Sequence, residues 1–239
     1  MTEYTFEASL EGVEFERIEL IRAQAYAKCS IEASQGKVTL SFQTNDSHFE
    51  SKTIAQLGVY ATRYLDRLCF KHKVQARGLH PTGYSEPKRD GVGRILVIEQ
   101  AFIYDIVEES VSLGPESRVA LKDFLEESKS PRDSLYSLYG LAIQQASPIS
   151  KFMTLYNIVL TLCNDSQREV DAFIERNEPE VTRTPSPRHP RQTETKYRRL
   201  RNEIAHKRAG VDLQSTSTEV EAVLPRFLQH IGKAIEDLA

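Results

Sequence analysis

The sequence predicts an α+β protein, in which a small antiparallel-sheet domain with one helix precedes an all-α, up-down helical bundle. Near the N-terminus, apolar residues alternate with polar ones, as they do in half-buried strands. After Gly114-Pro115 the apolar residues recur at intervals of three and four, as in amphipathic helices. Because strands and helices occupy separate halves of the chain, we expect two domains, residues 1–113 and 114–239.

The first half contains short alternating segments that are typical of strands. Residues 4–10 alternate strictly, and residues 26–33 and 38–42 flank Gln35-Gly36, which suits a tight turn. The second and third segments are therefore expected to form a β-hairpin. A helix is expected from about Lys52 to Phe70, because apolar residues there keep helical spacing.

Two further segments complete the first half. Glycines and prolines between Arg77 and Gly93 predict a long surface loop. The β-branched and aromatic residues from Arg94 to Val107 predict a long central strand. No catalytic motif occurs in this half.

The second half is expected to form a bundle of four or five helices. A loop that contains four prolines and carries basic residues, near residues 178–195, separates the earlier helices from the later ones. The helical segments lie around residues 119–125, 133–143, 148–174, 196–208 and 220–238, and Asn164-Asp165 is a possible bend or interruption in the third of them.

Composition narrows the class of protein. No apolar run approaches 18 residues, so no membrane span and no membrane partner are expected. The acidic, alternating N-terminus does not resemble a signal peptide, and three scattered cysteines suit a reducing compartment. These features favour a cytoplasmic protein.

Positive charge is concentrated in one segment. Residues 183–208 contain nine basic and two acidic side chains, a net charge of +7 in a chain whose net charge is −3. A basic stripe on an otherwise acidic protein is typical of a surface that follows nucleic-acid phosphates. It is equally typical of a solvated helix face beside a basic loop.

Arg201, Asn202 and His206 stand in the most basic part of this segment, on the helix expected near residues 196–208. At about 100° per residue, Asn202 and His206 lie about 40° apart, whereas Arg201 and His206 point about 140° apart. One helix is therefore expected to present the parts of a site without closing it. A second copy across a two-fold axis would close it.

The arrangement Arg-polar-x-x-x-His on a late helix of a small helical domain resembles the HEPN superfamily. Its Arg-Asn-x-x-x-His form is similar to that of the ApeA-like and MauJ-like branches. The resemblance covers roughly the last half of the chain. It implies a homodimer that cleaves RNA without a metal, with Arg201, Asn202 and His206 as the site.

The chemistry of these three side chains suits RNA cleavage. His206 can exchange a proton near neutral pH, as base toward the ribose 2′-OH or as acid toward the leaving oxygen. Arg201 would hold the phosphate oxygens in the transition state, and Asn202 would orient its neighbours. Attack by the 2′-OH gives a 2′,3′-cyclic phosphate. The residues expected to grip the RNA backbone are Arg198, Arg199, Lys207 and Arg208.

Other readings stay open. The sequence contains no Cys-x-x-Cys, His-Glu-x-x-His, phosphate-binding loop or nucleophile elbow, so it predicts neither a metal nor a cofactor. In one alternative, the three residues only stabilise the fold. In another, the helical domain is a non-catalytic module that dimerises or binds a ligand or nucleic acid. As an enzyme, the protein would suit phage defence or a toxin–antitoxin unit, with a regulatory protein or antitoxin as partner. A second Arg-x4-His pair, Arg67 and His72, lacks the polar residue, because Leu68 follows the arginine.

Overall fold

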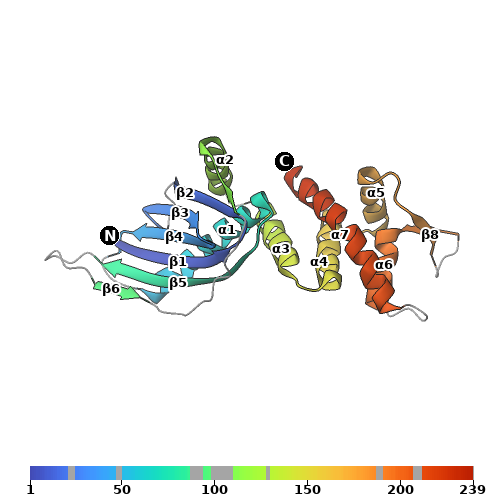
Figure 1. Ribbon diagram of the computed structural model, residues 1–239, viewed down its shortest axis with the longest axis horizontal. Helices are drawn as coiled ribbons and strands as arrows, with labels where there is room; N and C mark the ends of the chain where they lie inside the picture. Colours follow the sequence, from blue (N-terminus) through green and yellow to red (C-terminus); the bar gives the residue numbers. More distant parts are fainter. Residues whose placement is uncertain are drawn as a thin grey trace. The chain divides into compact units, whose positions relative to one another are not determined.

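The computed structural model describes residues 1–20, 25–46, 50–86, 94–97, 110–127, 130–186, 191–206 and 212–238 (Figure 1). The chain divides into two compact units, residues 1–133 and 134–239. The first unit consists mainly of a sheet, and the second consists mainly of helices. The expected α+β class, with the sheet first and the helices after it, is confirmed. None of the helices in these ranges is both long and apolar enough to span a membrane.

The first unit is built on a seven-stranded sheet with the order β6-β5-β1-β4-β3-β2-β7. Every neighbouring pair is antiparallel except β2 and β7, which are parallel. The strands are β1 (Thr2–Leu10), β2 (Val13–Leu20), β3 (Lys28–Ser34), β4 (Lys37–Thr44), β5 (Ala76–Glu86), β6 (Arg94–Val97) and β7 (Val111–Ser112).

The expected strand near the N-terminus and the expected hairpin are confirmed. Every second residue of β1 is buried, which gives the sheet one apolar face. Gln35 and Gly36 join β3 to β4 with positive φ angles of 52° and 72°. A two-residue turn with positive φ at both positions matches the right-handed twist of the strands that it connects, so this turn fixes the register of the hairpin.

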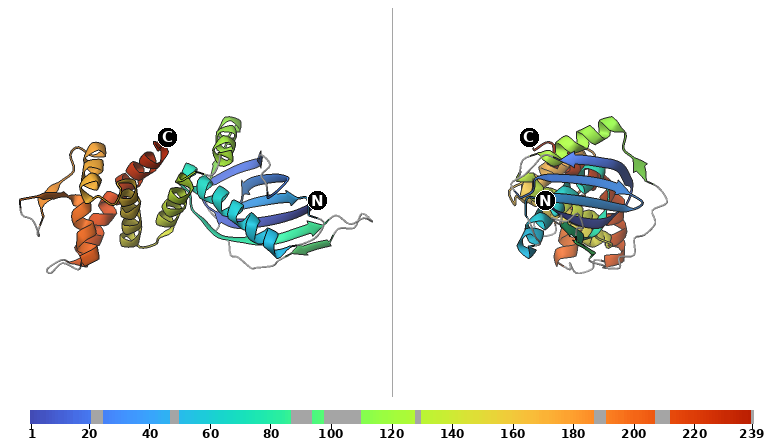
Figure 2. Two further views of the ribbon diagram at one scale, coloured as in Figure 1. Left: turned by 180° about the vertical axis from the view of Figure 1, so that it is seen from behind. Right: turned by 90° about the vertical axis from the view of Figure 1, so that its left-hand side faces the viewer.

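The helix expected between Lys52 and Phe70 is α1 (Ser51–His72), which lies across one face of the sheet (Figure 2). Leu57, Ala61 and Leu68 are buried at helical spacing and belong to the same core as the inward residues of the strands. Sheet and helix therefore share one hydrophobic core.

Three expectations for this unit were wrong or incomplete. The segment 77–86, expected as a loop, is part of β5; the pairing register of β5 with β1 shifts near Gly78 and Pro81, so irregularities accommodate both residues. β2 was not expected. A register shift between Phe15 and Ile18 exposes two successive residues there and breaks the alternation. β6 is an edge strand of the described sheet rather than a central one, and residues 98–109 lie outside the described ranges.

The division between the units falls after Asp133, later than the expected boundary at residue 113. The reason is that α2 (Pro115–Glu126) packs on the first unit, where Leu121 and Leu125 join the core of the sheet. Arg67 of α1, which is completely buried, also holds the end of α2, because it donates hydrogen bonds to the backbone carbonyls of Phe124, Leu125 and Glu127.

The second unit contains a helical core and a small β-ribbon. Aromatic rings from three helices meet in this core, among them Phe152, Tyr156, Tyr197 and Phe227. The elements after α3 (Arg132–Gln144) are α4 (Pro148–Leu162), α5 (Gln167–Asn177), β8 (Arg183–Pro185), β9 (Thr193–Thr195), α6 (Lys196–His206) and α7 (Leu213–Glu236).

The segment 178–195 is therefore not only a loop. Its two ends pair as the antiparallel strands β8 and β9, and residues 187–190 between them lie outside the described ranges. The prolines do not prevent the pairing, since Pro185 stands at the end of its strand, where fewer ladder hydrogen bonds are required. This ribbon leads directly into α6, which carries the candidate site.

Candidate functional site

Helix α6 is anchored by its apolar side and its first turn. Tyr197 and Leu200 are buried, and the Tyr197 ring lies 4.9 Å from that of Phe227 between centroids. Thr195, just before the helix, accepts a hydrogen bond at its Oγ1 from the Arg198 amide (3.3 Å). The same hydroxyl donates to Asp171 Oδ1 (2.8 Å), which ties α6 to α5. The helix therefore presents its polar side from a fixed position.

Arg201, Asn202 and His206 meet within one copy of the chain. Arg201 Nη1 donates to Asn202 Oδ1 at 3.0 Å and contacts His206 Nε2 at 3.3 Å. A guanidinium can only donate, so this contact is a hydrogen bond in the tautomer of His206 that carries its proton on Nδ1 and leaves Nε2 as the acceptor. Arg201 and Asn202 are half-buried, while His206 is exposed.

This convergence corrects the expectation that a single helix leaves the triplet open. The helical angle between Arg201 and His206 describes where their Cα–Cβ bonds point, and that angle is large. The long arginine side chain nevertheless reaches the imidazole, so that their nitrogens come within 3.3 Å. Nothing in this contact requires a second copy.

Glu194 is a functional candidate that the sequence did not indicate. It lies on β9, is 1% exposed, and its Oε2 accepts a hydrogen bond of 3.0 Å from Asn202 Nδ2. Arg198 Nε stands 3.8 Å from the same oxygen. Because the carboxylate takes the amide NH2 of Asn202, the amide oxygen is turned toward Arg201. The available signal was that Glu194 is one of only two acids in a strongly basic segment.

Arg201 also borders the buried interior. Its Nε is inaccessible to solvent and makes no hydrogen bond with the described residues. Tyr156 is fully buried, and burial raises the pKa of its hydroxyl, with a further increase from Asp171, while the nearby Arg201 and Arg198 oppose the increase. Tyr156 therefore stays neutral and donates a hydrogen bond to Gln167 Oε1 at 2.7 Å. The guanidinium of Arg201 therefore has its Nε on the buried side, while its Nη1 contacts the exposed His206.

Of the four residues expected to bind the RNA backbone, the structure describes two, and both are paired with carboxylates. Arg198 pairs with Asp171 at 2.9 Å, and Arg199 pairs with Glu203 at 2.7 Å and with Glu219 at 2.5 Å. Carboxylates thus balance the charges of both arginines. Lys207 and Arg208 lie outside the described residues.

Within the described ranges, no group of three or more His, Cys, Asp and Glu side chains is placed to hold a metal ion. Comparison of the chain with protein-family models, with curated proteins and with solved structures finds no match. The candidate site is therefore defined by the geometry of its own residues.

Proposed function

We propose that the second unit is a metal-independent endoribonuclease of the HEPN type. It would cleave RNA by attack of the ribose 2′-OH on the neighbouring phosphorus, leaving a 2′,3′-cyclic phosphate and a 5′-OH. The observation that carries the proposal is the contact of the exposed His206 imidazole with the guanidinium of Arg201 at 3.3 Å. A proton acceptor and a permanent cation side by side are what this reaction requires.

His206 is proposed to act as the general base. The 2′-OH proton passes to Nε2 as the 2′ oxygen bonds to phosphorus, and the bond from phosphorus to the 5′ oxygen breaks. The leaving oxygen takes a proton from His206 of a second copy or from water. A positioned acid or base of this kind contributes about 10²- to 10⁴-fold to a rate.

Arg201 is proposed to stabilise the charge that builds up on the phosphate. In the free protein its Nη1 contacts His206, so binding of the phosphate would draw the guanidinium away and release Nε2 to act as base. Asn202 and Glu194 are positioning residues in this proposal. Asn202 accepts from Arg201, and the buried Glu194 holds the Asn202 amide. By holding Arg201 in place beforehand, the two residues reduce the conformational entropy that its side chain would lose when RNA binds.

A homodimer remains part of the proposal. His206 is exposed at the C-terminal end of α6, so two copies related by a two-fold axis can bring two histidines to one cleft. RNA is the proposed substrate. Phage defence or a toxin–antitoxin unit, with an antitoxin or regulatory protein holding the activity off, is the setting that the resemblance to HEPN proteins suggests.

The test is cleavage of single-stranded RNA by the purified protein in EDTA, followed by analysis of the ends. We expect 2′,3′-cyclic phosphate and 5′-OH ends, no cleavage of DNA, and loss of cleavage in His206→Ala. The matched control is His72→Ala, which removes a histidine of α1 in the first unit and should leave cleavage unchanged. A folded His206→Ala protein that still cleaves at the wild-type rate rules the mechanism out.

The second candidate is a non-catalytic module that binds nucleic acid or a ligand. It is favoured by the observation that Arg201 donates to its own helix, while Arg198 and Arg199 are paired with carboxylates. Such a module would bind RNA equally well after His206→Ala, and its affinity would fall steeply with salt. RNA binding without cleavage by the wild-type protein would select this candidate.

A further inference from the structure

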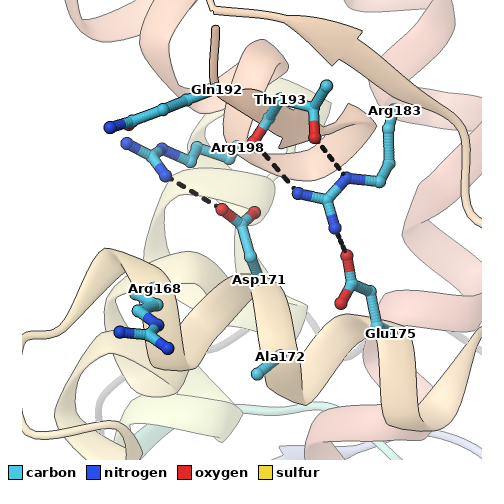
Figure 3. Close-up of a pocket in the computed structure, with 8 residues that line it drawn as sticks. All are labelled: Arg168, Asp171, Ala172, Glu175, Arg183, Gln192, Thr193 and Arg198. Atoms are coloured by element: carbon cyan, nitrogen blue, oxygen red, sulfur yellow. Dashed lines mark hydrogen bonds and ion pairs between the residues drawn. The ribbon is translucent and has the colours of Figure 1, made fainter.

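A pocket of about 520 Å³ lies between α5, the β8–β9 ribbon and the first turn of α6 (Figure 3). Its volume is within the range of small-molecule sites, roughly 300–1,000 Å³. Three arginines reach it from three elements: Arg168 from α5, Arg183 from β8 and Arg198 from α6. Two carboxylates, Asp171 and Glu175, also line it.

Both carboxylates are already compensated. Asp171 accepts from Arg198 at 2.9 Å, and at its other oxygen from the hydroxyl of Thr195 at 2.8 Å. Glu175 pairs with Arg183, whose other nitrogens donate to the side chain and backbone of Thr193 at 2.8 and 3.1 Å. These pairs build the walls of the pocket and leave little negative charge to repel an anion.

Arg168 supplies the positive charge of the pocket that no carboxylate of the described residues balances. It is exposed and has no hydrogen bond or ion pair with the described residues, so three guanidinium groups face two carboxylates. Figure 3 shows the Gln192 amide and the Arg198 guanidinium extending in the same direction, with Arg168 on the α5 side of the pocket. A planar guanidinium and an amide donor are groups that bind phosphate oxygens.

We propose that this pocket binds the phosphate group of a nucleotide, between Arg168 and Arg198, with Gln192 as a further donor. The phosphate can belong to a free nucleotide or to the 5′ end of an RNA strand, since both present the same group. The volume leaves room for the attached nucleoside. Binding here needs no reaction at His206, so it stands independently of the proposed cleavage.

The pocket is nevertheless connected to the triplet. Arg198 contacts both Asp171 in the pocket (2.9 Å) and Glu194 beneath the triplet (3.8 Å), and Glu194 accepts from Asn202 at 3.0 Å. On α6, Arg198 and Asn202 are four residues apart and so share a face. A phosphate bound to Arg198 is therefore held by a residue that also lies beside Glu194, the carboxylate that orients Asn202.

The test is a calorimetric titration of the full-length protein with 5′-AMP, with adenosine as the ligand that lacks the phosphate. We expect saturable 1:1 binding of 5′-AMP and at least about tenfold weaker binding of adenosine, since charge-assisted hydrogen bonds are lost. Arg168→Gln should weaken 5′-AMP about tenfold, and Ala172→Phe, which fills the pocket without a charge change, should abolish binding. Arg176→Gln is the matched control, because Arg176 is exposed on the same helix but does not line the pocket.

A second arm separates the two sources of phosphate. Short RNA with a 5′-phosphate and the same RNA with a 5′-OH are titrated into His206→Ala protein, so that no cleavage interferes. A preference for the phosphorylated RNA that Arg168→Gln removes assigns the pocket to an RNA end. Binding of 5′-AMP without that preference assigns it to a free nucleotide. The proposal is overturned if neither phosphate ligand binds at millimolar concentration, or if Arg168→Gln and Ala172→Phe bind as well as wild type.

Discussion

Arg67 and Arg201 each stand five residues before a histidine on a helix, but their surroundings have little in common. Arg67 is 0% exposed, pairs with Asp133 at 2.8 Å and donates to three backbone carbonyls. Arg201 is half-buried and contacts Asn202 and His206, and its Nε makes no hydrogen bond with the described residues.

The comparison teaches that the spacing alone does not identify a site. A guanidinium whose donors end on backbone carbonyls and a carboxylate stabilises the fold. A guanidinium directed at an exposed imidazole keeps donors that a substrate can recruit. The residue after each arginine reflects this difference, since Leu68 is buried in the core and Asn202 completes a polar network.

The largest expected effect is on stability, in the first unit. Arg67→Met should lower the free energy of unfolding by about 3–5 kcal/mol, because it leaves a carboxylate and several carbonyls without their donor. Arg201→Met should cost only about 1 kcal/mol, since the main bond that it removes is a single, partly buried hydrogen bond to the neutral Asn202 amide. Urea unfolding followed by circular dichroism measures both, as the chain has no tryptophan. Equal losses would mean that Arg201 is a structural residue too.

The second prediction concerns activity, for which Arg201 rather than Arg67 is the important arginine. Arg201→Met should reduce RNA cleavage about 10²- to 10³-fold, the usual effect of removing one donor to a transition-state oxyanion. Arg201→Lys should restore only part of the rate, because an ammonium lacks the two-pronged geometry. Single-turnover cleavage at saturating protein gives the rate of the chemical step. Wild-type rates in Arg201→Met would remove Arg201 from the mechanism.

What the sequence predicted correctly depended on local patterns. The alternation in β1, the turn at Gln35-Gly36 and the periodicity of α1 are encoded in neighbouring residues, and the structure confirms them. β2 was missed because a register shift exposes two successive residues and breaks its alternation, and β5 because its glycines and prolines are typical of a loop. Both strands form through register shifts, which depend on the partner strand. The assignment of α2 to the first unit depends on the burial of Leu121 and Leu125 in the core of the sheet and on the hydrogen bonds from Arg67, which are contacts between residues far apart in the chain.

The candidate site was predictable in its residue types but not in its geometry. Arg201, Asn202 and His206 are close in sequence, so their shared helix was expected and found. The contact from Arg201 to His206 was not expected, because a helical projection ignores side-chain length. Glu194 was not expected either, because its role depends on how β9 leads into α6, and no local pattern shows that a single acid will be buried.

The third prediction concerns Glu194, which holds the Asn202 amide that in turn accepts a hydrogen bond from Arg201. Glu194→Ala should cost about 1–3 kcal/mol, because it removes a buried charged acceptor from Asn202 and Arg198. It should also lower kcat for RNA cleavage more than it changes KM. Glu194→Gln keeps an amide oxygen for Asn202 and should recover most of kcat. If stability falls and kcat does not, Glu194 supports the fold alone.

The smallest expected effect comes from the other histidine of the comparison, and it depends on pH. His72 is half-buried, and burial, with a smaller contribution from the charge of Lys71, lowers the pKa of its imidazole. The folded pKa is then below the unfolded value of about 6.5, so protons bind the unfolded state more tightly. The stability contributed by neutral His72 is complete above that value and is lost as the pH falls below it. His72→Gln cannot titrate, so its unfolding free energy should fall less than that of wild type between about pH 7.5 and pH 5. Urea unfolding at both pH values measures the difference, and identical losses in the two proteins would show that His72 is as solvated in the folded chain as in the unfolded one.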